Sequence, residues 1–122
     1  MAKTILLVDD SATSRMMSRM LLGNMKEYEI LSACDGTECV EVALQRRPDL
    51  ILMDVEMPRM SGIEACRALR EHAATRKTPI VLLTMRGESK AVKTGFDSGC
   101  NEYLLKPLNE AVLVAILKKY LG

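Results

Sequence analysis

Aromatic residues are scarce in this chain of 122 residues, and tryptophan is absent. Aromatic side chains make up 3% of the sequence, too few for the stacking platforms that bind single-stranded nucleic acids. Lysine and arginine number 17 and aspartate and glutamate 16, so the formal net charge is only +1. Because both signs are interspersed, the charge pattern indicates neither a nucleic-acid-binding arm nor a polybasic membrane patch. We therefore expect no nucleic-acid partner and no membrane partner.

Ligands for a soft metal are also few. The only histidine is His72, and the four cysteines have spacings that match neither a CxxC redox motif nor a zinc knuckle. We expect Cys34, Cys39, Cys66 and Cys100 to be free, buried thiols of a reducing cytosol. No signal-peptide core and no apolar run of membrane-spanning length occurs. These absences predict a cytoplasmic protein.

Apolar residues, in contrast, make up 48% of the sequence, enough for one well-packed domain over residues 1–122. Several short apolar runs each stop at a polar or charged residue. The runs are Ile5–Val8 before Asp9, Leu50–Met53 before Asp54, Ile80–Leu83 before Thr84, and Tyr103–Leu105 before Lys106. Such short, bounded runs are typical of strands that are buried on both faces.

Segments with helical periodicity separate these runs, and 28–33, which mixes apolar and polar residues, reads as a less buried strand. Five strands that alternate with helices of ten or so residues predict βαβ units and a parallel sheet. The predicted fold class is α/β: a doubly wound, flavodoxin-like domain with five parallel strands in the order 2-1-3-4-5. The crevice of such a sheet lies between strands 1 and 3, at their carboxyl ends.

The helices differ in how clearly the sequence marks them. The first, from residue 11 or 12 to about 22, should bury Met16, Met17, Met20 and Leu21 and end at Gly23-Asn24. The second and third should be capped by Asp35 with Glu38, and by Ser61 with Glu64.

The fourth helix, about 88–98, has few apolar anchors, namely Ala91, Val92 and Phe96. It also contains Gly95, and an internal glycine costs about 1 kcal/mol relative to alanine. We expect this helix to be the most mobile. The last helix should span 108–121.

The polar residues that end the strands should meet at one edge of the sheet. Three carboxylates in one crevice, Asp9, Asp10 and Asp54, repel one another, and a hard divalent cation relieves the repulsion. Oxygen ligands without histidine or cysteine favour Mg²⁺. Lys106 adds a positive charge and Thr84 a hydroxyl, which together suit phosphoryl transfer to a carboxylate nucleophile. Taken singly, each of these residues is more often part of a helix cap or a turn than of a functional site. Their convergence at one edge of the sheet is not explained in that way.

With Met57-Pro58 and Ser61-Gly62 in the loop after Asp54, and Lys106-Pro107 after the fifth strand, the chain resembles bacterial two-component response-regulator receiver domains along its whole length. The chain corresponds either to a single-domain, chemotaxis-regulator-like member or to a receiver excised from a larger regulator. The resemblance implies that the chain is a signalling module and no enzyme beyond its own phosphorylation and dephosphorylation.

The resemblance also implies roles for individual residues. Asp54 is the phosphoacceptor, and Mg²⁺ is bound by Asp9, Asp10 and Asp54 with the backbone carbonyl of Glu56. Thr84 and Lys106 hold the phosphoryl group. Tyr103 is the aromatic switch that swings inward when Thr84 moves, and the Lys106-Pro107 peptide is cis.

Partners follow from the same resemblance. A sensor histidine kinase or a histidine phosphotransfer protein donates the phosphoryl group, and a downstream effector reads it. The seven successive apolar residues 111–117 suggest a contact surface shared with the fourth helix and fifth strand, in a monomer or a phosphorylation-dependent homodimer. The same apolar residues are explained equally well as a few scattered, exposed aliphatic side chains, which are common on protein surfaces. Arg15 and Arg19 either meet a kinase's phosphotransfer domain or are solvated.

Two positions vary within or depart from the family pattern. Met85 stands where alanine or glycine is usual, and we expect its long side chain to crowd the phosphoryl group and slow access. Glu56 places a carboxylate near the metal, where it either binds a metal-bound water or is merely solvated, and we expect it to be solvated. Two other functions are alternatives to this one. The first is a haloacid-dehalogenase-type phosphatase, which would need its nucleophile on the first strand and a cap domain. The second is a phosphorylation-independent receiver that acts only by binding.

Overall fold

A parallel five-stranded sheet forms the centre of the protein, seen in a computed structural model that describes residues 2–23 and 27–122. The strand order is β2-β1-β3-β4-β5, so the predicted doubly wound topology is confirmed. The strands are β1 (Lys3–Val8), β2 (Tyr28–Ala33), β3 (Leu50–Asp54), β4 (Ile80–Thr84) and β5 (Glu102–Leu105). As predicted, β2 is less buried than its neighbours, whereas every residue of β3 and β4 is buried.

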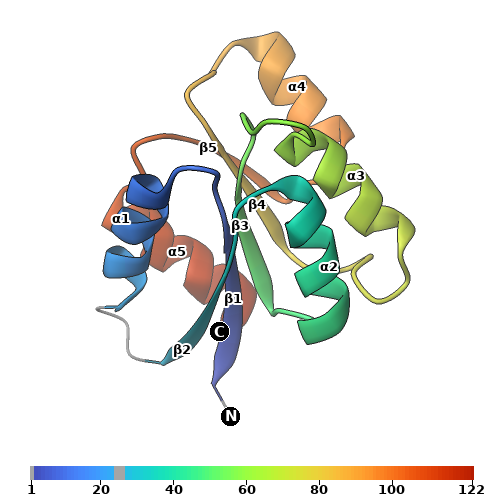
Figure 1. Cartoon of the computed structure of the whole chain (residues 1–122). Coiled ribbons are helices and arrows are strands. Elements are labelled where there is room, and N and C mark those ends of the chain that lie inside the picture. The colour runs from blue at the N-terminus through green and yellow to red at the C-terminus, as the bar shows by residue number, and fades with distance from the viewer. Residues whose placement is uncertain (1, 24–26) are drawn as a thin grey trace.

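Helices cover both faces of the sheet (Figure 1). One face carries α1 (Ala12–Gly23) and α5 (Glu110–Leu121). The other carries α2 (Gly36–Arg46), α3 (Gly62–Glu71) and α4 (Ser89–Asp97). This arrangement leaves the carboxyl ends of the strands uncovered by helices, at the top of Figure 1.

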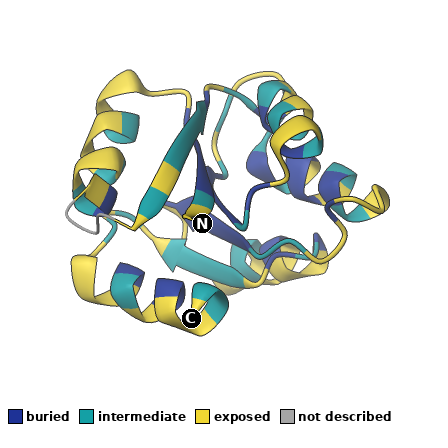
Figure 2. Cartoon of the chain, turned by 90° about the horizontal axis from the view of Figure 1, so that it is seen from below, coloured by how far each residue is buried: buried dark blue, intermediate teal, exposed yellow. Residues whose placement is uncertain are grey.

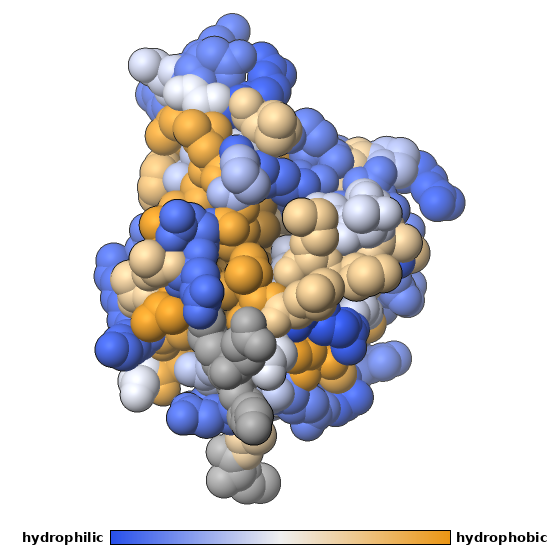
Figure 3. All heavy atoms as spheres, turned by 90° about the vertical axis from the view of Figure 1, so that its left-hand side faces the viewer, coloured by the Kyte–Doolittle hydropathy of each residue, from blue (hydrophilic) through white to orange (hydrophobic). Residues whose placement is uncertain are grey.

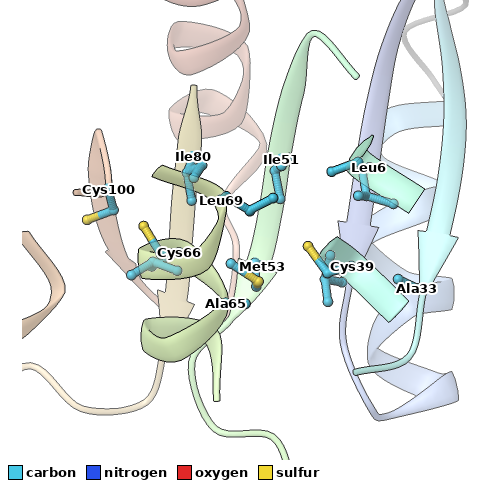
Figure 4. Packing of buried hydrophobic residues seen from close by; sticks show 13 residues of the cluster. Leu6, Ala33, Cys39, Ile51, Met53, Ala65, Cys66, Leu69, Ile80 and Cys100 are labelled. Atoms are coloured by element: carbon cyan, nitrogen blue, oxygen red, sulfur yellow. The ribbon is translucent and has the colours of Figure 1, made fainter. Parts of the chain in front are cut away.

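The core consists of one apolar cluster on each face, and Figure 2 shows the buried strands between more exposed helices. The cluster beneath α2 and α3 includes three of the four thiols, Cys39, Cys66 and Cys100 (Figure 4). Burial raises the pKa of Cys39 and of Cys100 to about 12, so both remain protonated and unreactive. All four cysteines are free, but the expectation of burial was wrong for Cys34, which is exposed.

The buried face of α1 differs from the prediction. Met16, Met17 and Met20 are 60%, 60% and 66% exposed, and the buried residue of the helix is Leu22. The pattern misleads because the helix turns its arginines toward the sheet edge: Arg15 donates to the backbone carbonyl of Asp9, and Arg19 to Ser32 Oγ. The helix ends at Gly23, as predicted, and Asn24 lies outside the described residues.

The cap of α3 orients the loop that follows β3. Ser61 Oγ accepts from Glu64 N, and the Glu64 carboxylate accepts from Ser61 N, which confirms the predicted capping box. The cap of α2 is offset by one residue: Asp35 accepts from Glu38 N, but Glu38 accepts from Cys34 N.

Helix α4 has no side-chain cap, and its only buried residue is Gly95. Phe96, expected as an anchor, is 47% exposed. The high mobility of α4 stays a prediction.

Candidate functional site

The strand register brings the predicted site residues to one edge. Asp54 pairs with Leu83, one residue before Thr84, and Thr84 pairs with Leu105, one residue before Lys106. Val8, which precedes Asp9, pairs with Met53. Parallel strands in this register end together, so the polar residues that follow their apolar runs converge, as the sequence predicts.

Lys106 is the cation at the centre of this edge. Its Nζ lies 3.3 Å from Asp54 Oδ2 and 3.4 Å from Asp9 Oδ2. The Lys106-Pro107 peptide is cis, as predicted. Burial lowers the pKa of Lys106, while the carboxylates of Asp54 and Asp9 raise it, and the net shift is upward. Lys106 is therefore charged at neutral pH and neutralises part of the carboxylate charge.

Asp54 has an unpartnered oxygen. Its Oδ1 is buried and accepts no hydrogen bond from the described residues, although Oδ2 faces Lys106. Burial raises the pKa of this carboxyl above its ordinary value. The positive charge of Lys106 opposes this rise, and the negative charges of Asp9 and Glu56 add to it. A buried carboxylate oxygen without a donor is costly, which marks it as a position for another group.

Three carboxylates surround that position. One oxygen from each of Asp9, Asp10 and Asp54 lies within 4.8 Å of the other two, with Asp10 exposed and the others buried. An all-oxygen set that leaves space for water suits Mg²⁺ rather than Zn²⁺. The donor set and the orphaned Asp54 Oδ1 therefore both fit a magnesium ion.

The side chain of Glu56 does not join the three aspartates. It extends toward β4, where both of its oxygens accept from Thr84 Oγ1, at 2.7 and 2.9 Å, and Oε1 also accepts from Met85 N at 3.3 Å. The expectation of a merely solvated Glu56 was wrong, because the β3–α3 loop directs the side chain at the hydroxyl that ends β4. Sequence reasoning placed both residues at the same edge but had no means of pairing them.

Tyr103 connects β5 to the loop after β4. Its hydroxyl donates to the backbone carbonyl of Arg86 at 2.9 Å, and its ring lies beside Phe96 at a centroid distance of 6.4 Å. A Cβ on Gly95 would come within 2.5 Å of the ring, so α4 packs closely on Tyr103. A cavity of about 490 Å³ adjoins this ring and is also lined by Val55, Glu56, Ile63 and the first turns of α4.

Met85 points to the α1 side of the edge. It is 72% exposed and lines a mainly apolar cavity of about 280 Å³ with Met17, Lys106 and Leu108. Figure 3 shows hydrophobic residues gathered on this face. The apolar run of α5 is only partly buried, because Leu113, Ile116 and Leu117 are buried whereas Val112 is exposed.

The response regulator receiver domain family matches residues 5–118. This chain belongs to that family. The match covers β1 from residue 5, the other four strands entirely, and every residue of the acidic edge. Receivers of this family act in two-component signalling.

Known receivers support this assignment. The chain is 41% identical over 119 residues to the phosphate regulon transcriptional regulatory protein PhoB of Pseudomonas aeruginosa, matching 98% of this chain and 52% of PhoB. It therefore spans about half the length of that relative. The structure of chemotaxis protein CheY4 of Vibrio cholerae superposes with a TM-score of 0.90, at 33% identity and covering 98% of this chain and 99% of CheY4.

A third relative is the receiver domain of sensor histidine kinase PA1611 from Pseudomonas aeruginosa PAO1. It superposes with a TM-score of 0.92 at 31% identity and covers 100% of this chain and 99% of that domain. No helix in the two described segments of our receiver is both long and apolar enough to cross a membrane.

Proposed function

We propose that this receiver accepts a phosphoryl group on Asp54, with Mg²⁺, from a sensor histidine kinase or a histidine phosphotransfer protein. The single observation that carries the proposal is the buried, unpartnered Asp54 Oδ1 beside Lys106 and two further carboxylates. The receiver of PA1611, whose structure has a magnesium ion in its active-site cleft, supports Mg²⁺ as the ion. A cytoplasmic location fits a phosphoryl donor of this kind.

The residues divide the chemistry among them. An Asp54 oxygen forms the new bond to phosphorus as the bond to the donor histidine breaks, and the histidine nitrogen keeps the electron pair. Lys106 neutralises charge on the phosphoryl oxygens, and the Thr84 hydroxyl donates to one of them. Asp9, Asp10, Asp54 and the Glu56 carbonyl would hold Mg²⁺, which would supply further positive charge when bound.

Phosphorylation would be read through Tyr103. When Thr84 turns toward the phosphoryl group, the space beside the Tyr103 ring changes, and α4 moves with it because Gly95 packs on that ring. The altered surface comprises α4, β5 and α5, where Leu105 and Val112 are exposed for an effector or a second copy. The chain then acts as a switch and catalyses only its own phosphorylation and dephosphorylation.

Acetyl phosphate, a small phosphodonor, tests the proposal without a cognate kinase. Intact-protein mass spectrometry after incubation with acetyl phosphate and Mg²⁺ should show one base-labile phosphoryl adduct. The adduct should be absent in Asp54→Asn and strongly reduced when the metal is chelated. No adduct on the unmodified protein contradicts the proposal and favours a receiver that acts only by binding.

A further inference from the structure

Glu56 and the phosphoryl group need the same hydrogen-bond donors. The Thr84 side chain is fully buried, and its single hydroxyl proton is directed at the Glu56 carboxylate. The hydroxyl oxygen also accepts one hydrogen bond, because Arg86 N donates to Thr84 Oγ1 at 3.0 Å. Thr84 therefore has no second proton for a group on Asp54 while it is bound to Glu56.

The neighbouring backbone amide is engaged by the same carboxylate. Met85 N donates to Glu56 Oε1, so two successive donors at the end of β4 point at one acidic side chain. The contact joins the β3–α3 loop to the β4–α4 loop. A carboxylate resembles a phosphoryl group in this setting, since both offer anionic oxygens to hydroxyl and amide donors.

Charge adds a second form of competition. A phosphoryl group on Asp54 carries about two negative charges, and Glu56 lies close enough to Asp54 for its charge to be felt there. The incoming group therefore meets both an occupied donor and a like charge. Relief requires that Glu56 swing out toward solvent, which is possible because the residue is exposed.

We propose that the Glu56 carboxylate is an internal competitor of the phosphoryl group for Thr84 Oγ1 and Met85 N, and that it thereby slows phosphoryl acceptance at Asp54. The inference rests on the proposed function, because it needs Asp54 to be the acceptor. Glu56 is a positioning residue: it acts through Thr84, Met85 N and its charge, and takes no part in bond formation.

Two variants of Glu56 separate the competition by charge from the competition by hydrogen bonding, and a third variant is the control. Glu56→Gln removes the charge and keeps one acceptor oxygen, whereas Glu56→Ala removes both. The matched control is Glu88→Gln, because Glu88 belongs to the same β4–α4 region and its carboxylate accepts from Arg86 rather than Thr84. All of them leave the backbone carbonyl of residue 56 in place.

The rate of adduct formation with acetyl phosphate and Mg²⁺ is the first measurement. Loss of one charge-assisted hydrogen bond at an exposed residue predicts a rise of about threefold for Glu56→Gln and about tenfold for Glu56→Ala. The affinity for beryllofluoride, a phosphoryl analogue that forms no acyl phosphate, should rise in the same order. Glu88→Gln should match the unmodified protein in both.

A direct readout of the contact needs no phosphodonor. In the nuclear magnetic resonance spectrum of the unphosphorylated protein, the Met85 amide proton should move upfield in Glu56→Ala, since it loses its acceptor. The same resonance should stay in place in Glu88→Gln.

The outcomes distinguish this inference from the proposed function. Adducts that form on Asp54 at equal rates in all variants overturn the role of Glu56 and leave Asp54 as the acceptor. Slower labelling in the Glu56 variants, or an equal rise in Glu88→Gln, also overturns it. Absence of an adduct in every protein, including the unmodified one, removes the proposed function itself.

Discussion

The two sides of the site differ in how well their polar groups are satisfied. On the side of β1 and β3, three carboxylates cluster, Lys106 contacts only Asp9 and Asp54, and Asp54 Oδ1 has no donor among the described residues. On the side of β4 and β5, Thr84 is bonded to Glu56, and Tyr103 to the Arg86 carbonyl. The comparison teaches that the acidic side has unsatisfied carboxylate charge that a cation would neutralise, whereas the polar groups on the side of β4 and β5 already have partners.

The largest expected effect comes from removing the shared cation. Lys106→Met keeps the length of the side chain but leaves Asp54 and Asp9 without compensation, so the free energy of unfolding should fall by roughly 2 kcal/mol. This is less than for a fully buried pair, because Lys106 retains 21% side-chain exposure. Urea denaturation measures it. Lys93→Met, which breaks an exposed ion pair with Asp97, should change the free energy of unfolding by less than about 0.5 kcal/mol. Equal losses in the two lysine variants would contradict the larger effect expected for Lys106.

Weakening the metal ligands should have the next largest effect. Asp10 is the exposed member of the acidic cluster, and Asp10→Asn should weaken Mg²⁺ binding about tenfold, equivalent to about 1.4 kcal/mol. Isothermal titration calorimetry with MgCl₂ measures the affinity. Glu41→Gln, an exposed acid outside the cluster, is the control, and a similar loss there would mean that general charge attracts the ion.

The close packing of the switch side predicts a smaller loss. In Gly95→Ala the new methyl group meets the Tyr103 ring, so overpacking should outweigh the gain in helix propensity and lower stability by about 1 kcal/mol. The displaced ring should lose its bond to Arg86, which Tyr103 side-chain resonances would report. A stabilised variant with an unmoved ring would show that α4 does not confine Tyr103.

Met85 should have the smallest effect. The crowding hypothesis predicts faster phosphorylation in Met85→Ala, but with 72% of the residue exposed we expect only about a twofold change. Rates of adduct formation and of its hydrolysis test this. Unchanged rates would reject crowding and leave Met85 as part of the apolar surface beside α1.

The sequence predicted the sheet and the acidic edge because both depend on strand ends. Short apolar runs such as that before Asp54 specify buried parallel strands, and the polar residue after each run must then emerge at the same edge. The directions in which side chains point were harder to predict from the sequence. The methionines of α1 fit a buried stripe by spacing, yet Leu22 occupies the interface. Likewise, the pairing of Glu56 with Thr84 depends on loop geometry that no periodicity encodes.

The stability of Asp54→Asn with and without Mg²⁺ tests the central claim that the acidic cluster around Asp54 is suited to bind a cation. Because burial raises the pKa of Asp54, the ionised form destabilises the fold as pH rises above the ordinary value of 3.8. At pH 7 without metal, Asp54→Asn should therefore be more stable by an amount on the order of 1 kcal/mol, and the difference should vanish below pH 3.8.

Saturating Mg²⁺ should reverse that order. The unmodified protein should gain about 2.7 kcal/mol at a metal concentration one hundred times Kd, and Asp54→Asn should gain much less. A variant that is less stable than the unmodified protein without metal, together with equal gains from Mg²⁺, would contradict the account.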